Sequence, residues 1–169
     1  MMSDPTLLSH LDAAYNLARW LMGNPVDAED VVHDAFVRAM AGAGRFRGGD
    51  ERAWLLAIVR NACYSTHRRQ RVRQASALDP LDEDAHEDTA APSPEQRAID
   101  GDTRRRVRRA VEALAPEFRE VIVLREFEGL SYKEIADVVD VPIGTIMSRL
   151  SRARGQLAAA LGTQEGARA

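Results

Sequence analysis

The chain has 169 residues, of which 45% are hydrophobic and 5% aromatic, with one cysteine and a formal net charge of −3. Its longest uninterrupted apolar run, Ala53–Val59, is far shorter than the ~20 residues that a membrane-spanning helix needs, and residues 1–10 lack the basic start and apolar core of a secretion signal. We therefore expect no membrane insertion. A single Cys63 cannot close an internal disulfide, so we also expect a reducing, cytoplasmic location.

The net charge is distributed unevenly along the chain. Residues 1–60, 61–74, 75–102 and 103–169 carry net charges of −2, +4, −8 and +3. Two regions with basic clusters therefore flank an acidic one, and this arrangement is compatible with nucleic-acid binding despite the negative total.

The first 74 residues are predicted to form three helices. Apolar residues recur every three or four positions between Leu7 and Met22, which predicts a helix that begins at Asp4 and ends at Gly23. A second helix is expected from Asp27, and a third from about Arg52, apolar on every side at first and then basic. The buried stripe of the second helix would comprise Ala28, Val31, Val32, Ala35, Phe36 and Ala39.

The middle of the chain differs from both ends. Residues 75–95 contain three prolines and an acidic block, a composition that cannot bury enough apolar surface to order itself. Helical periodicity resumes near Val107, and Pro116 suits the start of a helix that would end at Gly129. No β-strand alternation occurs, so the sequence predicts an all-α protein. It would have two small domains, 1–74 and 103–169, joined by a flexible acidic linker, 75–102.

A helix-turn-helix is the most informative pattern in the second half. Ser131 and Glu134 have the spacing of a capping box, and Leu130 and Ile135 stand where a hydrophobic staple would place them. Pro142 cannot continue a helix, so it separates this short helix from a second one that starts near residue 143.

The second helix of this motif has an apolar face and a small, hydroxylated and cationic face. Such a face suits the major groove of DNA, where hydroxyls and guanidinium groups meet base edges and phosphates. The alternative is the solvated face of an ordinary helical hairpin. The residues predicted to read DNA here are Thr145, Met147, Ser148, Arg149, Ser151 and Arg152.

Four segments resemble bacterial sigma factors. Residues 124–136 and 141–154 are similar to the promoter-reading C-terminal domain, region 4, and residues 27–36 and 54–61 to the N-terminal domain, region 2, of the extracytoplasmic-function class of the sigma-70 family. The resemblance covers nearly the whole chain except the linker and the two ends. Two positions depart from the usual pattern: His33 replaces a common Gln, and Met147 replaces a Lys or Arg that often contacts DNA.

The resemblance implies a function for the whole chain. It would join core RNA polymerase at the clamp and flap regions, recognise a two-part promoter, open the DNA and be controlled by an anti-sigma factor. It would use no catalytic residue, metal or cofactor. The exposed face of the second helix would dock on the clamp, although an ordinary solvated face would have the same composition; its residues are Glu29, Asp30, Asp34 and Arg38.

The resemblance also implies two contacts with the downstream promoter element. A Gly-rich loop would capture a flipped base, because it combines backbone freedom with polar groups, and a bland surface turn is its alternative. This loop comprises Phe46, Arg47, Gly48, Gly49 and Asp50. The basic end of the third helix would contact the opened strand, the alternative being a cationic helix end that favours its own dipole. Its residues are Arg60, Asn61, Tyr64, Arg68 and Arg69.

Other classes of protein explain fewer features of the sequence. The four histidines have no metal-ligand spacing with Cys63, and neither a phosphate-binding loop nor a nucleophile motif occurs, which argues against an enzyme. A sigma-like partner-switch protein, which sequesters an anti-sigma factor without binding DNA, would not need the arginines of both predicted DNA surfaces. A dimeric helix-turn-helix regulator would leave the first 74 residues unexplained.

Overall fold

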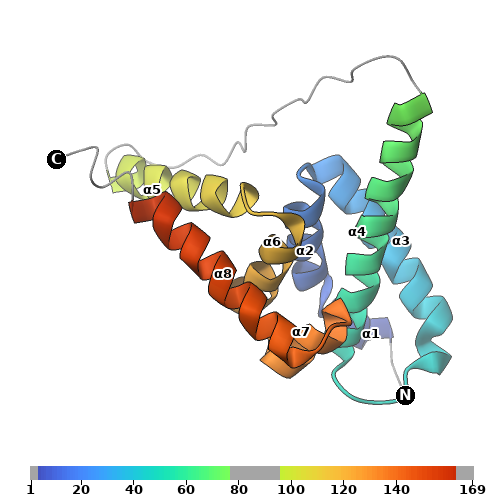
Figure 1. The fold of residues 1–169 in the computed structure, drawn as a ribbon. Helices are drawn as coiled ribbons and strands as arrows, with labels where there is room; N and C mark the ends of the chain where they lie inside the picture. The colour runs from blue at the N-terminus through green and yellow to red at the C-terminus, as the bar shows by residue number, and fades with distance from the viewer. Residues whose placement is uncertain (1–3, 77–95, 163–169) are drawn as a thin grey trace.

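The computed structural model describes residues 4–76 and 96–162, in which all regular elements are helical (Figure 1). This confirms the all-α prediction. The elements are α1 (Asp4–Leu8), α2 (Leu11–Met22), α3 (Pro25–Gly42), the 3-10 turn η1 (Ala43–Arg45), α4 (Glu51–Ser76), α5 (Gln96–Glu112), α6 (Pro116–Ile122), the π-helical turn η2 (Val123–Phe127), α7 (Tyr132–Val139) and α8 (Ile143–Gly162).

The first predicted helix is in fact two helices, so the prediction of one continuous helix was wrong. The hydroxyl of Ser9 donates to the carbonyl of Thr6 at 2.6 Å, and the amide of His10 donates to the carbonyl of Leu7 at 3.1 Å. These short-range bonds close a turn after α1, because a serine hydroxyl competes with the helical hydrogen-bond pattern. The predicted end of α2 at Gly23 is confirmed, with φ of 83°.

Helix α3 starts two residues earlier than predicted. Asn24 is the N-cap, its side chain accepts a hydrogen bond from the Asp27 amide at 2.8 Å, and Pro25 occupies the first turn. An Asn followed by Pro is a stronger start signal than the acidic first turn that suggested Asp27. All six residues of the predicted apolar stripe of α3 are buried.

Helix α4 is the centre of the first half, which agrees with the apolar start on every side that the sequence predicts. Its buried residues include Leu55, Leu56 and Val59, and it packs against α2, α3 and α7. Residues 71–76, at the end of this 26-residue helix, are exposed and extend beyond that packed region.

Both ends of the predicted linker are helical. Residues 75–76 belong to α4 and α5 begins at Gln96, so the assignment of residues 75–76 and 96–102 to a flexible linker was wrong, while residues 77–95 lie outside the described part of the chain. Further on, α6 continues into η2 and the segment ends at Gly129, whose φ is 68°. The amide of Leu130 then donates to the carbonyl of Leu124 at 3.0 Å, as in a glycine-terminated helix.

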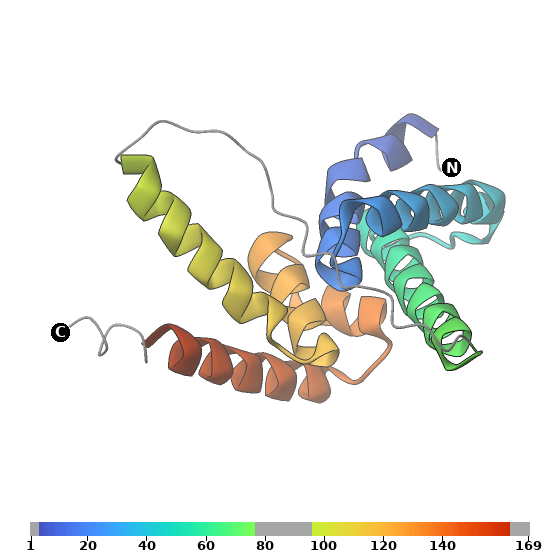
Figure 2. The same ribbon diagram turned by 90° about the horizontal axis from the view of Figure 1, so that it is seen from above.

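The two halves of the described chain pack against each other. Helix α2 contacts α6 and η2, and α4 contacts α7. Figure 2 shows α1 to α4 on one side and α5 to α8 on the other, with this contact between them. The rings of Trp20 and Phe127 stack across it, with centroids 5.4 Å apart. Buried residues of both halves therefore form one continuous apolar cluster.

Candidate nucleic-acid interface

The approach to α7 is held by side-chain contacts. The hydroxyl of Ser131 accepts from the Glu134 amide at 3.2 Å, and the Glu134 carboxylate accepts from the Ser131 amide at 2.6 Å, which confirms the capping box. The Arg125 guanidinium lies 4.8 Å from the centre of the Tyr132 ring and donates to the carbonyl of Leu130 at 2.7 Å. These contacts fix how the first helix of the helix-turn-helix is presented.

Helix α8 carries the residues predicted to read the upstream element. Ile146, Leu150 and Ala153 are buried, which confirms the apolar face predicted for this helix. Thr145 and Arg149 are half-buried. The other four predicted contact residues are exposed: Met147, Ser148, Ser151 and Arg152. The exposed part of this face is therefore hydroxylated, with one cation and one apolar side chain.

The loop predicted to capture a base is anchored at both ends. Phe46 packs against Trp54, with ring centroids 5.4 Å apart and planes tilted by 60°. One carboxylate oxygen of Asp50 accepts a hydrogen bond from the Ala53 amide at 2.7 Å, and so caps α4.

Between these anchors the loop exposes its backbone. Gly48 and Gly49 have φ of 90° and 105°, a region that side-chain-bearing residues rarely adopt, and Arg47 beside them is exposed. The path of the backbone through this loop therefore requires glycine at both positions. Accessible amides beside a cation are what capture of a base or phosphate requires.

The predicted downstream-element residues of α4 separate into two groups. Asn61, Arg68 and Arg69 are exposed. Arg60 and Tyr64 are half-buried and point toward the second half of the chain, where the guanidinium of Arg60 lies 4.5 Å from the centre of the Tyr64 ring. The structure therefore does not gather all five residues on one open surface.

The basic end of α4 is oriented by its contacts with α2 and α3. His67 Nε2 lies 2.7 Å from the carbonyl oxygen of Leu21, and the side-chain amide of Gln70 donates to the Asp27 carboxylate at 3.3 Å. These bonds fix the rotation of α4 about its axis.

Glu120 of α6 is the centre of a charged cluster between the halves. It is fully buried. Arg60 donates to both its carboxylate oxygens, Nε at 2.7 Å and Nη2 at 3.2 Å, and the Tyr64 hydroxyl donates at 3.1 Å. Nη1 of Arg149 lies 3.7 Å from Oε1 of the same carboxylate. Three predicted DNA-contacting residues thus converge on one buried anion.

The charge of Glu120 perturbs its neighbours. Burial alone would lower the pKa of the Arg60 guanidinium, but the hydrogen bonds and negative charge of Glu120 outweigh it, so that pKa is raised. Burial, reinforced by the same carboxylate, raises the pKa of the Tyr64 hydroxyl well above its usual range. Both groups are therefore held in their protonated forms.

Glu128, which follows η2, makes a second charged contact between the halves. Its carboxylate accepts from Asn16 at 2.5 Å and from Nη2 of Arg52 at 2.7 Å, and its backbone carbonyl accepts from the same Arg52 atom at 2.6 Å. Only 9% of the Glu128 side chain is exposed.

Sequence reasoning missed both glutamates. For Glu120 a signal existed, because it lies four residues before the buried Leu124 and so shares its helical face. Their arginine partners could not be inferred, since they lie on α4, about 60 to 76 residues away in sequence.

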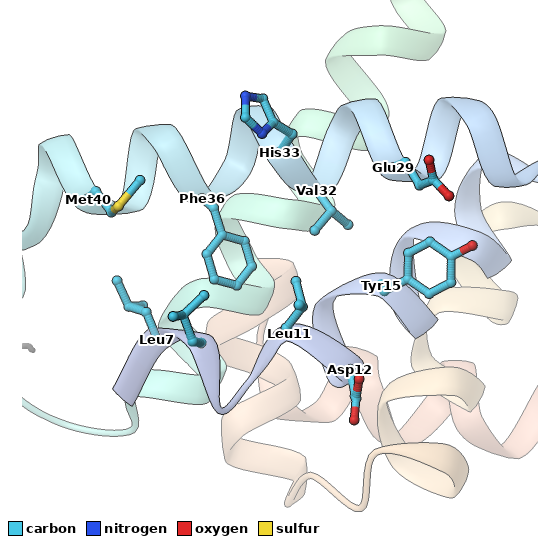
Figure 3. Close-up of a pocket in the computed structure, with 10 residues that line it drawn as sticks. Leu7, Leu11, Asp12, Tyr15, Glu29, Val32, His33, Phe36 and Met40 are labelled. Carbon is cyan, nitrogen blue, oxygen red and sulfur yellow. The ribbon is translucent and has the colours of Figure 1, made fainter. Parts of the chain in front are cut away.

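The predicted polymerase-docking face of α3 is exposed. Glu29 and Asp30 are exposed, and Arg38 pairs with Asp34 one turn away at 2.7 Å. Beside it runs an apolar groove of about 600 Å³ between α3 and the α1–α2 turn (Figure 3). The predicted stripe gave no sign of this groove, which depends on the break between α1 and α2. Its lining includes Leu8, Leu11, Tyr15, Val32, Phe36 and Met40.

The described residues contain neither a candidate metal site nor a candidate membrane-spanning helix. Within 4–76 and 96–162, no cluster of three or more His, Cys, Asp or Glu side chains has the arrangement of a metal site. None of the helices described there is long and apolar enough to cross a membrane.

Both halves of the chain match known family models. Residues 7–73 match Sigma-70 region 2, and residues 104–157 match Sigma-70, region 4. The two matches contain every residue predicted above to contact DNA or polymerase.

Curated relatives span most of the chain. The chain is 36% identical over 155 residues to the ECF RNA polymerase sigma factor SigE of Mycolicibacterium smegmatis, covering 91% of this chain and 59% of that protein. It is 35% identical to the RNA polymerase sigma-H factor of Pseudomonas aeruginosa, covering 80% of this chain and 73% of that protein.

Solved structures agree with the fold. The sigma factor RpoE from Bartonella quintana, in complex with the anti-sigma factor NepR, superposes with a TM-score of 0.76 at 32% identity, covering 94% of this chain and 95% of that chain. CnrH in complex with the cytosolic domain of CnrY superposes with a TM-score of 0.64 at 26% identity, covering 94% and 87%. The chain belongs to the extracytoplasmic-function class of the sigma-70 family.

Proposed function

We propose that this chain is a sigma factor that binds core RNA polymerase, recognises a two-part promoter and opens the DNA to start transcription. It performs these steps by binding alone and is not an enzyme. The observation that carries the proposal is the pairing, in one chain, of a helix-turn-helix with an exposed polar recognition face and a long helix with an exposed basic end.

The division of labour follows the two family matches. Residues 1–74 would dock on polymerase and contact the downstream element, residues 103–169 would read the upstream element, and residues 75–102 would connect them, with α5 already begun at Gln96.

Each surface has a chemical role in this proposal. On α8, the exposed hydroxyls of Ser148 and Ser151 and the guanidinium of Arg152 reach base edges and phosphates of duplex DNA. On α4, Arg68 and Arg69 hold phosphates of the separated strand while Asn61 offers an amide to a base.

Polymerase docking would use the remaining exposed face. Helix α3 presents Glu29, Asp30 and the Asp34–Arg38 pair to the clamp, and the second half contacts the flap region. Charges of this kind set the association rate and the choice of partner more than the affinity.

Control by an anti-sigma factor in the cytoplasm completes the proposal. Two structures that share this fold, RpoE and CnrH, were each solved with a protein bound, NepR described as an anti-sigma factor and CnrY through its cytosolic domain. By analogy, the partner of this chain would cover the α3 face and part of the second half.

In vitro transcription with core polymerase from the source organism tests the function. The templates are fragments of the source genome, and transcript 5′ ends are sequenced with and without the chain. We expect chain-dependent starts that share one two-part upstream motif. The Arg68→Ala/Arg69→Ala variant should lose open-complex formation, and the Glu117→Gln variant, at an exposed position away from the proposed surfaces, should behave as wild type.

Absence of any chain-dependent start would overturn the proposal. If the chain then still bound an anti-sigma factor tightly, the partner-switch alternative would replace it.

A further inference from the structure

The first two turns of α8 expose two large apolar side chains. Ile143 is 44% exposed and Met147 is 53% exposed, and because they lie four residues apart in the helix, they are neighbours on its surface. The apolar residues that pack α8 against the rest of the chain are different ones, namely Ile146, Leu150 and Ala153, which are buried. Ile143 and Met147 thus present apolar surface at the end of the helix that a helix-turn-helix directs at base edges.

The surroundings of Met147 leave it accessible. Gly144, three residues before it, has no side chain, and a Cβ placed there would meet open space, so nothing at that position covers Met147. Ser151, one turn later, is an exposed hydroxyl. Arg154, about two turns further along the same side, is held by Glu126, which accepts from its Nη2 at 2.6 Å and its Nε at 3.1 Å. The surface around Met147 is therefore apolar and hydroxylated, and the cation that follows it on that side of α8 is engaged within the protein.

A methionine at this position selects a particular group in the major groove. Its side chain has no N–H or O–H donor, and its sulfur is only a weak acceptor, so it cannot satisfy the polar edges of the bases. The apolar group that base pairs present in the major groove is the C5-methyl of thymine. The Lys or Arg usual at this position would instead contact a phosphate or the acceptors of guanine. Met147 therefore changes which base this part of the helix favours.

We propose that Met147, with Ile143 beside it, contacts the C5-methyl of a thymine in the upstream promoter element and makes the chain select thymine at that base pair. The inference deepens the proposed function and rests on it for the assignment of α8 to duplex DNA. A protein partner could also cover an apolar pair, but the exposed hydroxyls and the Arg152 guanidinium around it suit base edges and phosphates. Met147 then contributes specificity, and Arg152 contributes affinity for any sequence.

Selection from random DNA tests the inference without a known promoter. The full chain and its Met147→Ala variant are each incubated with duplexes that contain a segment of random sequence, and the bound duplexes are amplified and sequenced. We expect the wild-type chain to enrich a motif with a fixed thymine that the Met147→Ala variant no longer selects. The alanine side chain is too short to reach the same methyl group.

Removal of the methyl group alone gives the decisive measurement. In the selected duplex, each thymine is replaced in turn by deoxyuridine, which keeps the base-pairing groups and lacks only the C5-methyl. Measured by fluorescence anisotropy, deoxyuridine at the contacted position should weaken wild-type binding about fourfold, the factor that corresponds to ~0.8 kcal/mol for one buried methylene-sized group. Met147→Leu should keep this discrimination, because leucine is also apolar and reaches out from the helix, whereas Met147→Ala should abolish it.

A matched control lies on the exposed surface of the same helix. Arg152→Ala should weaken binding to the thymine and the deoxyuridine duplexes by the same factor, since a phosphate contact does not depend on the methyl group. Ile143→Ser should reduce the discrimination, because water then reaches the apolar contact. Circular dichroism should report the same helix content in all variants.

Two results would overturn the inference. One is a selected duplex in which no thymine methyl affects binding, and the other is an equal loss on deoxyuridine substitution in the wild type and in Met147→Ala. If thymine selection by Met147 is confirmed but no promoter-specific transcription occurs, only the proposed function is overturned.

Discussion

Helix α4 carries arginines about two turns apart that have the same predicted role but opposite surroundings. Arg60 is half-buried and bound to Glu120, whereas Arg68 and Arg69 are exposed. The same contrast occurs on α8, where Arg149 faces Glu120 and Arg152 faces solvent. In each predicted DNA surface, the arginine nearer the contact between the halves is engaged within the protein and the farther one is accessible.

This contrast shows that a shared helix and a shared residue type do not give a shared environment. Periodicity assigns a residue to a face, but contact with a distant segment decides whether that face is open. The packing of the halves thus divides each predicted surface into a part that is engaged within the protein and a part that is accessible.

The largest expected difference is in stability. Arg60→Ala should lower the free energy of unfolding by about 3 kcal/mol, because it leaves the buried Glu120 carboxylate without its bidentate partner. Arg68→Ala should change it by less than about 0.5 kcal/mol, since Arg68 is exposed. Urea unfolding monitored by circular dichroism measures both. Equal effects would show that the Glu120 pair is as solvated as the surface.

The second difference is in promoter affinity. Arg152→Ala should weaken promoter binding by about 2 kcal/mol in the complex with core polymerase, and Arg149→Ala by a similar amount, while binding to core polymerase is unchanged. In the free chain only Arg152→Ala should weaken duplex binding, because Arg149 is engaged by Glu120. Anisotropy titrations with and without polymerase check this, and unchanged promoter binding in both variants would remove α8 as the reading face.

The Tyr64 hydroxyl should contribute less. Tyr64→Phe removes one hydrogen bond to the buried carboxylate and should cost about 1 kcal/mol of stability. In the double variant with Glu120→Gln, the total loss of stability should be smaller than the sum of the two single losses, since both changes affect one interaction. Full additivity in urea unfolding would mean that the hydroxyl acts elsewhere.

The smallest effect is a dependence on alkaline pH. Burial raises the pKa of the Cys63 thiol to about 12 from 9.0, so the folded chain keeps a proton that the unfolded chain releases earlier. The contribution of this thiol to the free energy of unfolding is fully present below pH 9 and is lost as the pH rises toward 12. We expect a loss of about 1 kcal/mol between pH 8 and 10. This loss should shrink in Cys63→Ala, and an identical pH slope in both proteins would contradict it.

Local patterns predicted most of the fold. The capping box at Ser131, the end of α2 at Gly23 and the apolar stripes of α3 and α8 each depend on residues within a few positions of one another, which is why sequence spacing sufficed. The breaks and boundaries were less accessible. The turn at Ser9 depends on a single hydroxyl. The helical start at Gln96 lacks the apolar periodicity that would predict it.

The candidate site was predictable in content but not in arrangement. Residue types and spacing identified the two basic stretches, because cations with amides and hydroxyls are typical of nucleic-acid contacts. The pairing of Glu120 and Glu128 with arginines of α4 depends on how segments 60 to 76 residues apart in sequence pack together, and no local pattern predicts it. The groove beside α3 has the same origin, since it forms only where the α1–α2 turn meets that helix.

The most direct test of this account is the distance between the halves before and after polymerase binding. With spin labels at Gln74→Cys on α4 and Gln156→Cys on α8, in a Cys63→Ala background, we expect one narrow distance distribution for the free chain and a shift to clearly longer distances on addition of core RNA polymerase. In that complex, Arg60 and Arg149 would no longer share the Glu120 carboxylate. An unchanged distribution in the fully assembled complex would contradict the claim that contact with Glu120 and contact with DNA are alternatives for these two arginines.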